Sequence, residues 1–291
     1  MMALAPAKIN LFLHVAAPGA DGFHPLSSLM VFADIGDQVS LTPAEALGLK
    51  VYGPFAAELE GEGDNLVLRA AHALAAQARR PLAPVGLALE KSLPVAAGLG
   101  GGSSDAGTAL RLLRTAWDLP MSDHDLEAVA ASLGSDGAAC LWGRPVLAEG
   151  RGERLRPAPD LPVIDAVLVN PRVSVSTGQV YGLYDRAGRF SDPAPPPMPD
   201  SLESVQELAA WLTTTTNDLQ APAVDLAPVI GDVLTTLADE PEALMARMSG
   251  SGATCFALCA SDLEAQGLAD RIGRMRPDWW VQPCRLGGPW A

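Results

Sequence analysis

The sequence predicts a protein that combines β-strands with α-helices in about two domains, and three observations support this expectation. The chain has 291 residues, whereas a single domain commonly holds roughly 150. Apolar residues recur at a spacing of two in some stretches and of three to four in others, which indicates strands and helices respectively. Hydrophobic residues make up 48% of the chain and charged residues 19%, so ordinary cores can form.

A glycine-rich loop lies at the centre of this pattern. Val85, Leu87 and Leu89 alternate with small or polar residues and predict a strand. The apolar residues of Ala106–Trp117 predict a helix. A strand, a glycine loop and a helix start, in this order, direct unpaired N–H groups and the positive end of a helix dipole at an anion, usually a phosphate. The loop consists of Pro94, Val95, Ala96, Ala97, Gly98, Leu99, Gly100, Gly101, Gly102, Ser103 and Ser104.

The spacing within this loop excludes three common phosphate-binding motifs. A P-loop needs a lysine directly after its last glycine, and no lysine follows Lys91 before the helix ends. A dinucleotide-binding loop needs glycine where Ser103 stands, and the motifs that accompany a protein-kinase glycine loop are missing. Ser103, Ser104 and Asp105 are residue types that cap a helix. A loop whose glycines serve only tight packing stays as the alternative.

Charge and cysteine content restrict the possible partners. The net charge of −14 divides about evenly between the two halves, so a nucleic-acid partner is not expected. The four cysteines form no Cys-x-x-Cys pair and the four histidines no cluster, which disfavours a metal site and suits a reducing cytoplasm. No uncharged apolar run reaches roughly 18 residues. Lys8, Asn10 and His14 interrupt the apolar N-terminal stretch, so neither a membrane span nor a signal peptide is expected.

Local patterns define the elements of the N-terminal half. A strand over residues 8–15 places Lys8 and Asn10 on one face, and a solvated edge strand is the alternative to a functional role. An acid such as Asp136, in a Gly-x-Asp-Gly turn, is most often a cap or a turn former. The predicted elements are this strand, a turn at 20–26, a strand over 31–41 with a turn at Gly36-Asp37, and helices over 67–77, 106–117 and 123–133.

The C-terminal half follows a segment that reads as a hinge. Glu149-Gly150-Arg151-Gly152 places the expected domain boundary between 1–152 and 153–291. The predicted elements beyond it are a strand over 163–169, an irregular proline-rich loop over 192–199, a helix capped by Asn217, a short helix over 242–248, a glycine turn at 249–252 and a strand over 254–259.

Three segments resemble the motifs of one enzyme family. Pro94-x-x-x-Gly98-Leu99-Gly100-Gly101-Gly102-Ser103-Ser104 is similar to the second motif of the GHMP kinases, which include galacto-, homoserine, mevalonate and phosphomevalonate kinases. Residues 6–11 (Pro-Ala-Lys-Ile-Asn-Leu) resemble the first motif, and residues 248–253 (Met-Ser-Gly-Ser-Gly-Ala) the third. The resemblance covers nearly the whole chain. It implies an α+β fold with an N-terminal domain like the second domain of ribosomal protein S5 and a ferredoxin-like C-terminal domain.

The resemblance also implies an activity and a set of site residues. The triple-glycine form of the loop is typical of the members that transfer the γ-phosphoryl of ATP to the 2-hydroxyl of 4-diphosphocytidyl-2-C-methyl-D-erythritol in the non-mevalonate isoprenoid pathway. Pro94–Ser104 then cradles the phosphates of ATP, with Mg²⁺ expected beside them. Lys8 and Asp136 are the expected catalytic residues, with Asp136 as the general base. Asn10, Phe23, His24 and Tyr181 are expected to bind the substrate, with the cytosine ring between the two aromatic rings.

Two departures and two alternatives accompany this expectation. Phe23 stands where the family also has tyrosine, so any role of that hydroxyl is absent. Asp136-Gly137-Ala138 replaces the usual Asp-Val-Pro, which puts the stiffness of this turn in question but leaves the carboxylate in place. The alternatives are a related kinase that acts on mevalonate or homoserine, and a nucleotide-binding regulator without catalysis. The oligomeric state does not follow from the sequence.

Overall fold

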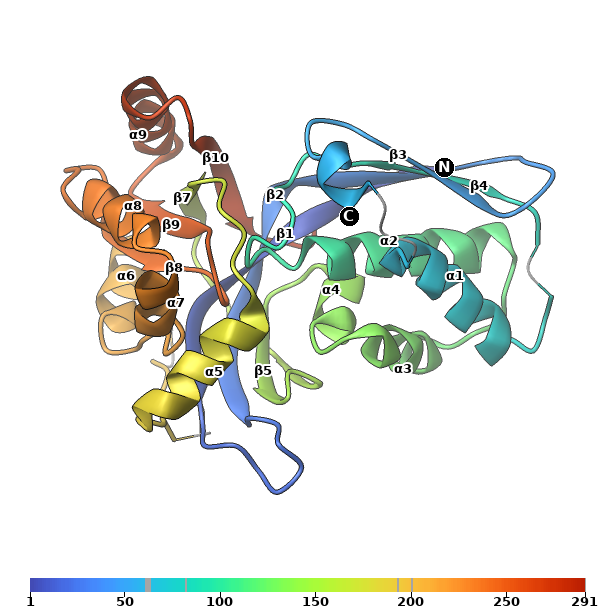
Figure 1. Cartoon of the computed structure of the whole chain (residues 1–291), viewed down its shortest axis with the longest axis horizontal. Coiled ribbons are helices and arrows are strands. Elements are labelled where there is room, and N and C mark those ends of the chain that lie inside the picture. The colour runs from blue at the N-terminus through green and yellow to red at the C-terminus, as the bar shows by residue number, and fades with distance from the viewer. Residues whose placement is uncertain (61–63, 82, 193, 200, 291) are drawn as a thin grey trace.

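The computed structural model describes residues 1–60, 64–81, 83–192, 194–199 and 201–290. It has two halves that share one continuous sheet, with β1–β4 and α1–α4 on one side and β7–β10 and α5–α9 on the other (Figure 1). The N-terminal elements are β1 (Met2–Val15), β2 (Leu26–Thr42), β3 (Gly48–Tyr52), a 3-10 turn (Ala56–Leu59), α1 (Leu66–Gln77), β4 (Gly86–Glu90), α2 (Gly101–Ala116), α3 (Asp123–Leu133), α4 (Gly137–Trp142), β5 (Val146–Gly150) and β6 (Arg154–Pro157). The C-terminal elements are β7 (Ile164–Asn170), α5 (Thr177–Ala187), α6 (Val205–Leu212), α7 (Gln220–Leu226), α8 (Val229–Ala238), β8 (Met245–Met248), β9 (Cys255–Cys259), α9 (Asp262–Met275) and β10 (Trp280–Gly287).

In the N-terminal half, helices α1–α4 lie on one face of the sheet (Figure 1). β1 and β4 pair antiparallel with β2, and β3 pairs parallel with β4. The alternating residues Leu87 and Leu89 of β4 belong to the same core as Leu110 and Leu113 of α2, as the period of two predicts. α2 approaches α4 closely because Gly107 has no side chain: a Cβ there would lie 2.9 Å from the Cα of Leu141.

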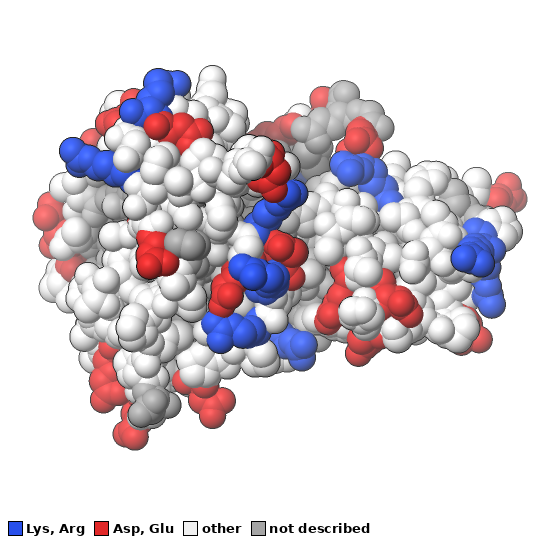
Figure 2. Space-filling model, turned by 90° about the horizontal axis from the view of Figure 1, so that it is seen from below, with Lys and Arg blue, Asp and Glu red and all other residues white. Residues whose placement is uncertain are grey.

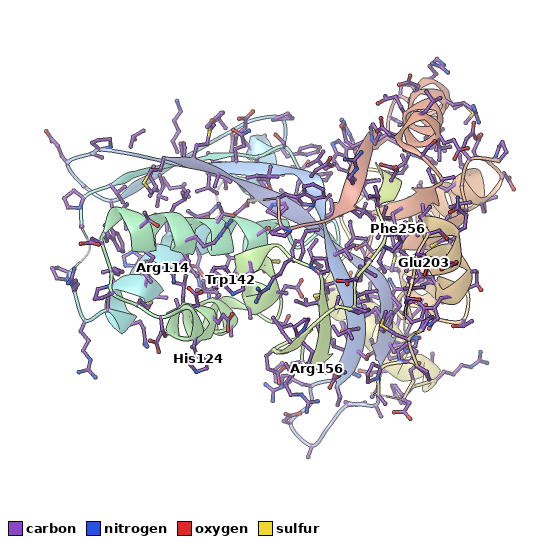
Figure 3. All side chains as sticks on the ribbon, turned by 180° about the vertical axis from the view of Figure 1, so that it is seen from behind. Arg114, His124, Trp142, Arg156, Glu203 and Phe256 are labelled. Carbon is purple, nitrogen blue, oxygen red and sulfur yellow. The ribbon has the colours of Figure 1, made fainter. Side chains whose placement is uncertain are left out.

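The back of the molecule shows how α2, α3 and α4 are joined (Figure 3). The guanidinium of Arg114 in α2 lies 5.9 Å from the ring centroid of Trp142 at the end of α4. The indole N–H of Trp142 donates to Glu127 of α3 at 2.6 Å. These contacts fix the helices that flank the turn containing Asp136.

The C-terminal half has the ferredoxin-like topology that the resemblance implies. Its strands lie in the order β10-β7-β9-β8, all antiparallel, and helices connect β7 to β8 and β9 to β10. Both faces are buried, since Leu168 and Phe256 pack with α6 in one core while Val169 and Ala257 face α5, α7, α8 and α9 in another. The last strand, β10, pairs with β2 through Leu286 and Gly287 and so joins the two halves.

The expected alternation of core-facing and site-facing side chains along β1 holds only as far as Leu11. The register between β1 and β2 shifts between Pro6 and Lys8 and again between Asn10 and Phe12. Such bulges re-aim side chains and are common beside active sites. As a result, Phe12 joins Leu11 in one core instead of sharing a face with Lys8 and Asn10.

Three local expectations are wrong. The turn expected at Gly36-Asp37 lies inside β2, where Gly36 pairs with Pro6, and a Cβ on Gly36 would collide with the backbone of Ala5. Residues 242–248 do not form a helix, because Met245–Met248 pairs with β9 as a strand. Asn217 is not the cap residue of α7, which begins after Leu219; its side-chain oxygen accepts the N–H of Leu219 at 3.0 Å, just before the helix starts.

The segment expected to be a hinge is the turn of a hairpin. Glu149 and Gly150 end β5, residues 151–153 turn, and β6 follows, paired antiparallel with β5. The division into 1–152 and 153–291 stays a prediction. Among the described residues, no helix is both long and apolar enough to cross a bilayer.

Candidate active site

A cavity of about 1710 Å³ lies between the two halves and gathers the predicted site residues. Its walls include the glycine loop from Pro94 to Ser103 and, from other segments, Lys8, Asn10, Phe23, His24, Asp136 and Tyr181. Ser104 does not line this cavity. It is fully buried, and its hydroxyl donates to the carbonyl of Pro6 at 2.6 Å, which holds the start of α2 against β1.

The glycine loop leaves the N-terminus of α2 open. α2 begins at Gly101 after Gly100, whose φ is +62°, and no side chain caps it. The expectation that Ser103, Ser104 or Asp105 caps this helix is therefore wrong, because all three lie inside its first turns. Among the described residues, no hydrogen bond satisfies the N–H groups of Gly101, Gly102 and Ser103. Free N–H groups at a positive dipole end form an anion site.

A buried cluster of charged residues, formed by Lys91, Asp37 and Asp105, lies beside the start of α2. The ammonium of Lys91 contacts a carboxylate oxygen of Asp37 and lies 3.0 Å from Asp105 of α2. The other oxygen of Asp37 accepts the backbone N–H groups of Ser92 at 2.6 Å and Leu93 at 2.9 Å. The sequence analysis missed this cluster, since three charges spread over about seventy residues form no local motif.

Burial sets the protonation of this cluster. Burial raises the pKa of Asp105 to about 8, although the attraction of Lys91 opposes the rise. Burial disfavours the ammonium of Lys91, but the two carboxylates outweigh it and raise the pKa of Lys91. Burial thus favours the neutral form of Asp105, and Lys91 lies between the two carboxyl groups. The cluster therefore places less negative charge beneath the anion site than two unpaired carboxylates would.

Lys8 and Asp136 form an ion pair on the cavity wall. The ammonium of Lys8 lies 3.1 Å from Asp136 and donates to the side-chain oxygen of Asn10 at 2.7 Å. Asp136 occupies the position before α4 but makes no capping bond with its side chain. Its carboxylate, 28% exposed, therefore faces Lys8 and the cavity instead of closing a turn. Lys8 is only 4% exposed, which disagrees with a solvated edge strand.

The glycine after Asp136, where the family usually has valine, has a steric explanation. A Cβ at Gly137 would collide with the carbonyl of Ala130 in α3. Glycine therefore lets the start of α4 pass close to α3, and the N–H of Gly137 donates to Gly134 at 3.0 Å to close the turn. The structure gives no steric reason for the loss of the proline at Ala138.

The third glycine motif, from the C-terminal half, packs against the glycine loop and is hydrogen-bonded to it. The hydroxyl of Ser249 donates to the carbonyl of Gly98 at 3.0 Å, and the N–H of Thr254 donates to Ala97 at 3.1 Å. Gly98 has a φ of +76° and packs so tightly that a Cβ would collide with the backbone of Ser249. The amide of Asn217 donates to the carbonyls of Met248 and Gly250, at 2.8 and 2.7 Å.

The opposite end of the cavity is aromatic and more exposed. Phe23 is 54% exposed, and the guanidinium of Arg151 lies 3.9 Å from its ring centroid. Arg151 also pairs with Asp21, which accepts the N–H of Phe23 at 3.0 Å. One face of Phe23 is thus covered by a cation.

His24 and Tyr181 pack together at this end. Their ring centroids are 5.1 Å apart. The Nδ1 atom of His24 donates to the carbonyl of Ala16 at 2.8 Å, and its Nε2 lies 3.2 Å from Asp185. A hydrogen bond from this ring to a base would require giving up one of these contacts. Burial, with the nearby carboxylates Asp136 and Asp185, raises the pKa of Tyr181 to about 12.

Charge on the surface is mixed. On the face shown in Figure 2, lysine and arginine side chains lie beside aspartate and glutamate instead of forming one continuous basic surface. Within the described parts of the chain, no group of three or more histidine, cysteine or acidic residues could hold a metal ion. The cavity residues thus offer no protein cage for a cation.

Comparisons with known proteins show to which family the chain belongs. The family model "GHMP kinases N terminal domain" matches residues 65–144 and "GHMP kinases C terminal" matches 200–278. A 4-diphosphocytidyl-2-C-methyl-D-erythritol kinase from Caulobacter sp. (strain K31) is 64% identical over 288 residues, covering 99% of this chain and 98% of the relative. A protein of the same name from Cereibacter sphaeroides (strain ATCC 17029 / ATH 2.4.9) is 49% identical over 290 residues, covering 98% and 99%.

Solved structures with a similar fold are also kinases of this superfamily. A crystal structure of 4-(cytidine 5'-diphospho)-2C-methyl-D-erythritol kinase has a TM-score of 0.80 and 33% identity, covering 99% of this chain and all of that one. A homoserine kinase from Cytophaga hutchinsonii shares the fold, with a TM-score of 0.66, 18% identity and coverage of 97% and 95%. The chain therefore belongs to the GHMP kinases and, within them, to the family of 4-diphosphocytidyl-2-C-methyl-D-erythritol kinases.

Proposed function

We propose that this protein transfers the γ-phosphoryl group of ATP to the 2-hydroxyl of 4-diphosphocytidyl-2-C-methyl-D-erythritol, a step of the non-mevalonate isoprenoid pathway. One observation carries the proposal: the Lys8–Asp136 pair opens into the same cavity as an uncapped helix start. The main chain of Lys8 is also tied to the glycine loop, because its N–H donates to Leu99 at 2.8 Å. A proton acceptor, a cation and an anion site thus line one cavity.

In this mechanism, Asp136 accepts the proton of the substrate hydroxyl as it attacks the γ-phosphorus. Lys8 stabilises the ionised carboxylate and offsets the charge that spreads over the transferred phosphoryl group. The leaving ADP stays bound through its phosphates. Phosphoryl transfer asks the protein mainly for positioning and charge stabilisation, which a buried lysine and a rigid loop supply.

The glycine loop is the proposed ATP site. The free N–H groups of Gly101, Gly102 and Ser103 and the positive end of α2 attract the phosphates. We expect Mg²⁺ to accompany ATP, held by phosphate oxygens and water, because the described cavity residues form no cage for it. It would supply further charge neutralisation at the phosphates.

The aromatic end is the proposed cytidine site. Phe23 and Tyr181 offer ring faces for the base, and His24 steadies Tyr181 by packing against it. Binding energy from this remote end orients the 2-hydroxyl toward Asp136. A cytoplasmic location fits the four cysteines, which are all free. We expect no nucleic-acid or membrane partner.

ADP release tests this proposal. The purified protein with ATP and Mg²⁺ would be assayed against 4-diphosphocytidyl-2-C-methyl-D-erythritol, mevalonate, homoserine and galactose. We expect the cytidine compound to give the highest kcat/KM. A higher value for mevalonate or homoserine would assign the chain to a related kinase activity. ATP binding without ADP release on any acceptor would indicate a non-catalytic nucleotide-binding protein.

A further inference from the structure

A serine outside the predicted site is connected to the catalytic lysine through two hydrogen bonds. Ser28 lies in β2 and is fully buried. Its hydroxyl donates to the carbonyl of Phe12 at 2.6 Å and accepts from the side-chain NH₂ of Asn10 at 2.7 Å. The oxygen of Asn10 in turn accepts from the ammonium of Lys8, also at 2.7 Å.

The direction of every hydrogen bond in this chain is set by its two ends. A backbone carbonyl only accepts, so Ser28 must give its single proton to Phe12. The hydroxyl can then only accept from Asn10, which turns the NH₂ group toward Ser28. An ammonium only donates, so the oxygen of Asn10 must face Lys8. Both ends thus demand the same orientation of the Asn10 amide.

The pairing of β1 with β2 makes this connection possible. Asn10 is paired with Met30, and Ser28 lies two residues away along β2, on the same face as Met30. Ser28 is thus the diagonal neighbour of Asn10, close enough for their side chains to meet. The carbonyl of Leu11, where the register shifts, accepts from the buried guanidinium of Arg247 at 2.7 Å.

We propose that Ser28 is a positioning residue for phosphoryl transfer: it locks the Asn10 amide so that its oxygen holds the Lys8 ammonium against Asp136. Without the hydroxyl, the amide can rotate and present its NH₂ group to the ammonium, which repels it. Lys8 then loses its fixed distance of 3.1 Å to Asp136. This inference rests on the roles proposed above for Lys8 and Asp136.

A matched pair of variants tests the inference. Ser28→Ala removes the acceptor, and we expect kcat to fall roughly 10- to 100-fold, as for other residues that orient a reacting group through one intermediary, while KM for ATP changes little. Ser27→Ala is the control, because Ser27 is equally buried in the same strand but its hydroxyl has no partner among the described residues. We expect Ser27→Ala to keep the wild-type kcat. Ser28→Thr keeps the hydroxyl and should recover much of the rate.

A double variant separates positioning from a general structural effect. If Ser28 acts through Lys8, Ser28→Ala should cause no further loss of kcat in a Lys8→Met background. The same fold-loss in both backgrounds, or a wild-type kcat in Ser28→Ala, would overturn the inference and leave the proposed function intact. A wild-type kcat in Lys8→Met would overturn both. Should Ser28→Ala fail to fold, Ser28→Cys gives the same test, because a thiol is a weak acceptor of similar size.

Discussion

The two ends of the cavity are built in opposite ways. At the glycine loop, the charged groups are buried and each is held by several partners, as with Lys91 between Asp37 and Asp105. At the aromatic end, Phe23 is 54% exposed and is touched mainly by Arg151. The two ends therefore differ in how firmly the fold holds them. The proposed catalytic end is buried and held by several partners, whereas the proposed cytidine end is more exposed and would be covered by the bound substrate.

This contrast predicts different kinetic effects at the two ends. Changes at the rigid end should lower kcat or ATP binding, because geometry and charge are lost there. Changes at the aromatic end should raise KM for the cytidine substrate and leave ATP binding unchanged. The following predictions test that separation.

The largest effect is expected at Asp136. Asp136→Asn keeps the shape and removes the base, so kcat should fall by about 10²- to 10⁴-fold. Asp64→Asn is the control, since Asp64 also lines the cavity but is 78% exposed and should keep its rate. Steady-state kinetics with both substrates measure this. A near-normal kcat in Asp136→Asn would reduce this residue to a turn former.

A smaller effect is expected where the two glycine motifs meet. Gly98→Ala forces a side chain onto a φ of +76° and into the backbone of Ser249. The strain is about 1–3 kcal/mol, equivalent to roughly 5- to 150-fold in KM for ATP. At Gly267 in α9, which does not line the cavity, a Cβ would meet nothing within 4 Å, so Gly267→Ala is the control. Equal ATP affinity of both variants, measured by calorimetry, would contradict the packing described here.

Removing the ring of Phe23 or Tyr181 should change KM for the cytidine substrate and leave KM for ATP unchanged. Stacking on an aromatic ring is worth about 1–3 kcal/mol per base, so Tyr181→Ala and Phe23→Ala should each raise KM for this substrate by roughly 5- to 150-fold. Phe190→Ala serves as the control, because Phe190 lies 6.3 Å from His24 but does not line the cavity. An unchanged KM in both variants would argue against a base between these rings.

The smallest effect on catalysis is expected at Asp105, which should instead make stability depend on pH. Burial raises its pKa from 3.8 to about 8 in the folded state, so the folded protein binds a proton that the unfolded chain releases. The contribution of this group to the free energy of unfolding should therefore decrease as the pH rises from about 4 to about 8. Asp105→Asn, which resembles the protonated form, should show a flatter pH profile in urea unfolding. Parallel profiles for the variant and the wild type would show that Asp105 is ionised in the fold.

Much of the site could be predicted because its residues belong to local motifs. The glycines of the loop are recognisable from their spacing, and Lys8 and Asp136 from the resemblance of their segments to family motifs; the structure brings them to one cavity. Asp37 could not be found in this way. Beside Gly36 it reads as a turn, yet it lies inside β2 and accepts three hydrogen bonds there.

The short strand β8 illustrates a second kind of error. Met245–Met248 has no alternation strong enough to indicate a strand, and its neighbours favour a helix. Pairing with β9 decides the outcome, because the glycine turn at 249–252 brings the two segments together. Tertiary contacts override a weak local preference in such short segments.

Local pattern thus specifies which residues can bind a phosphate, accept a proton or stack on a base, because those properties belong to single side chains and short loops. Which of them work together depends on contacts between distant segments. The pairing of β1 with β2 brings Asn10 to Ser28, and Gly98 meets Ser249 across the two halves. Neither contact leaves a trace in local sequence, since register and close packing are properties of the whole fold.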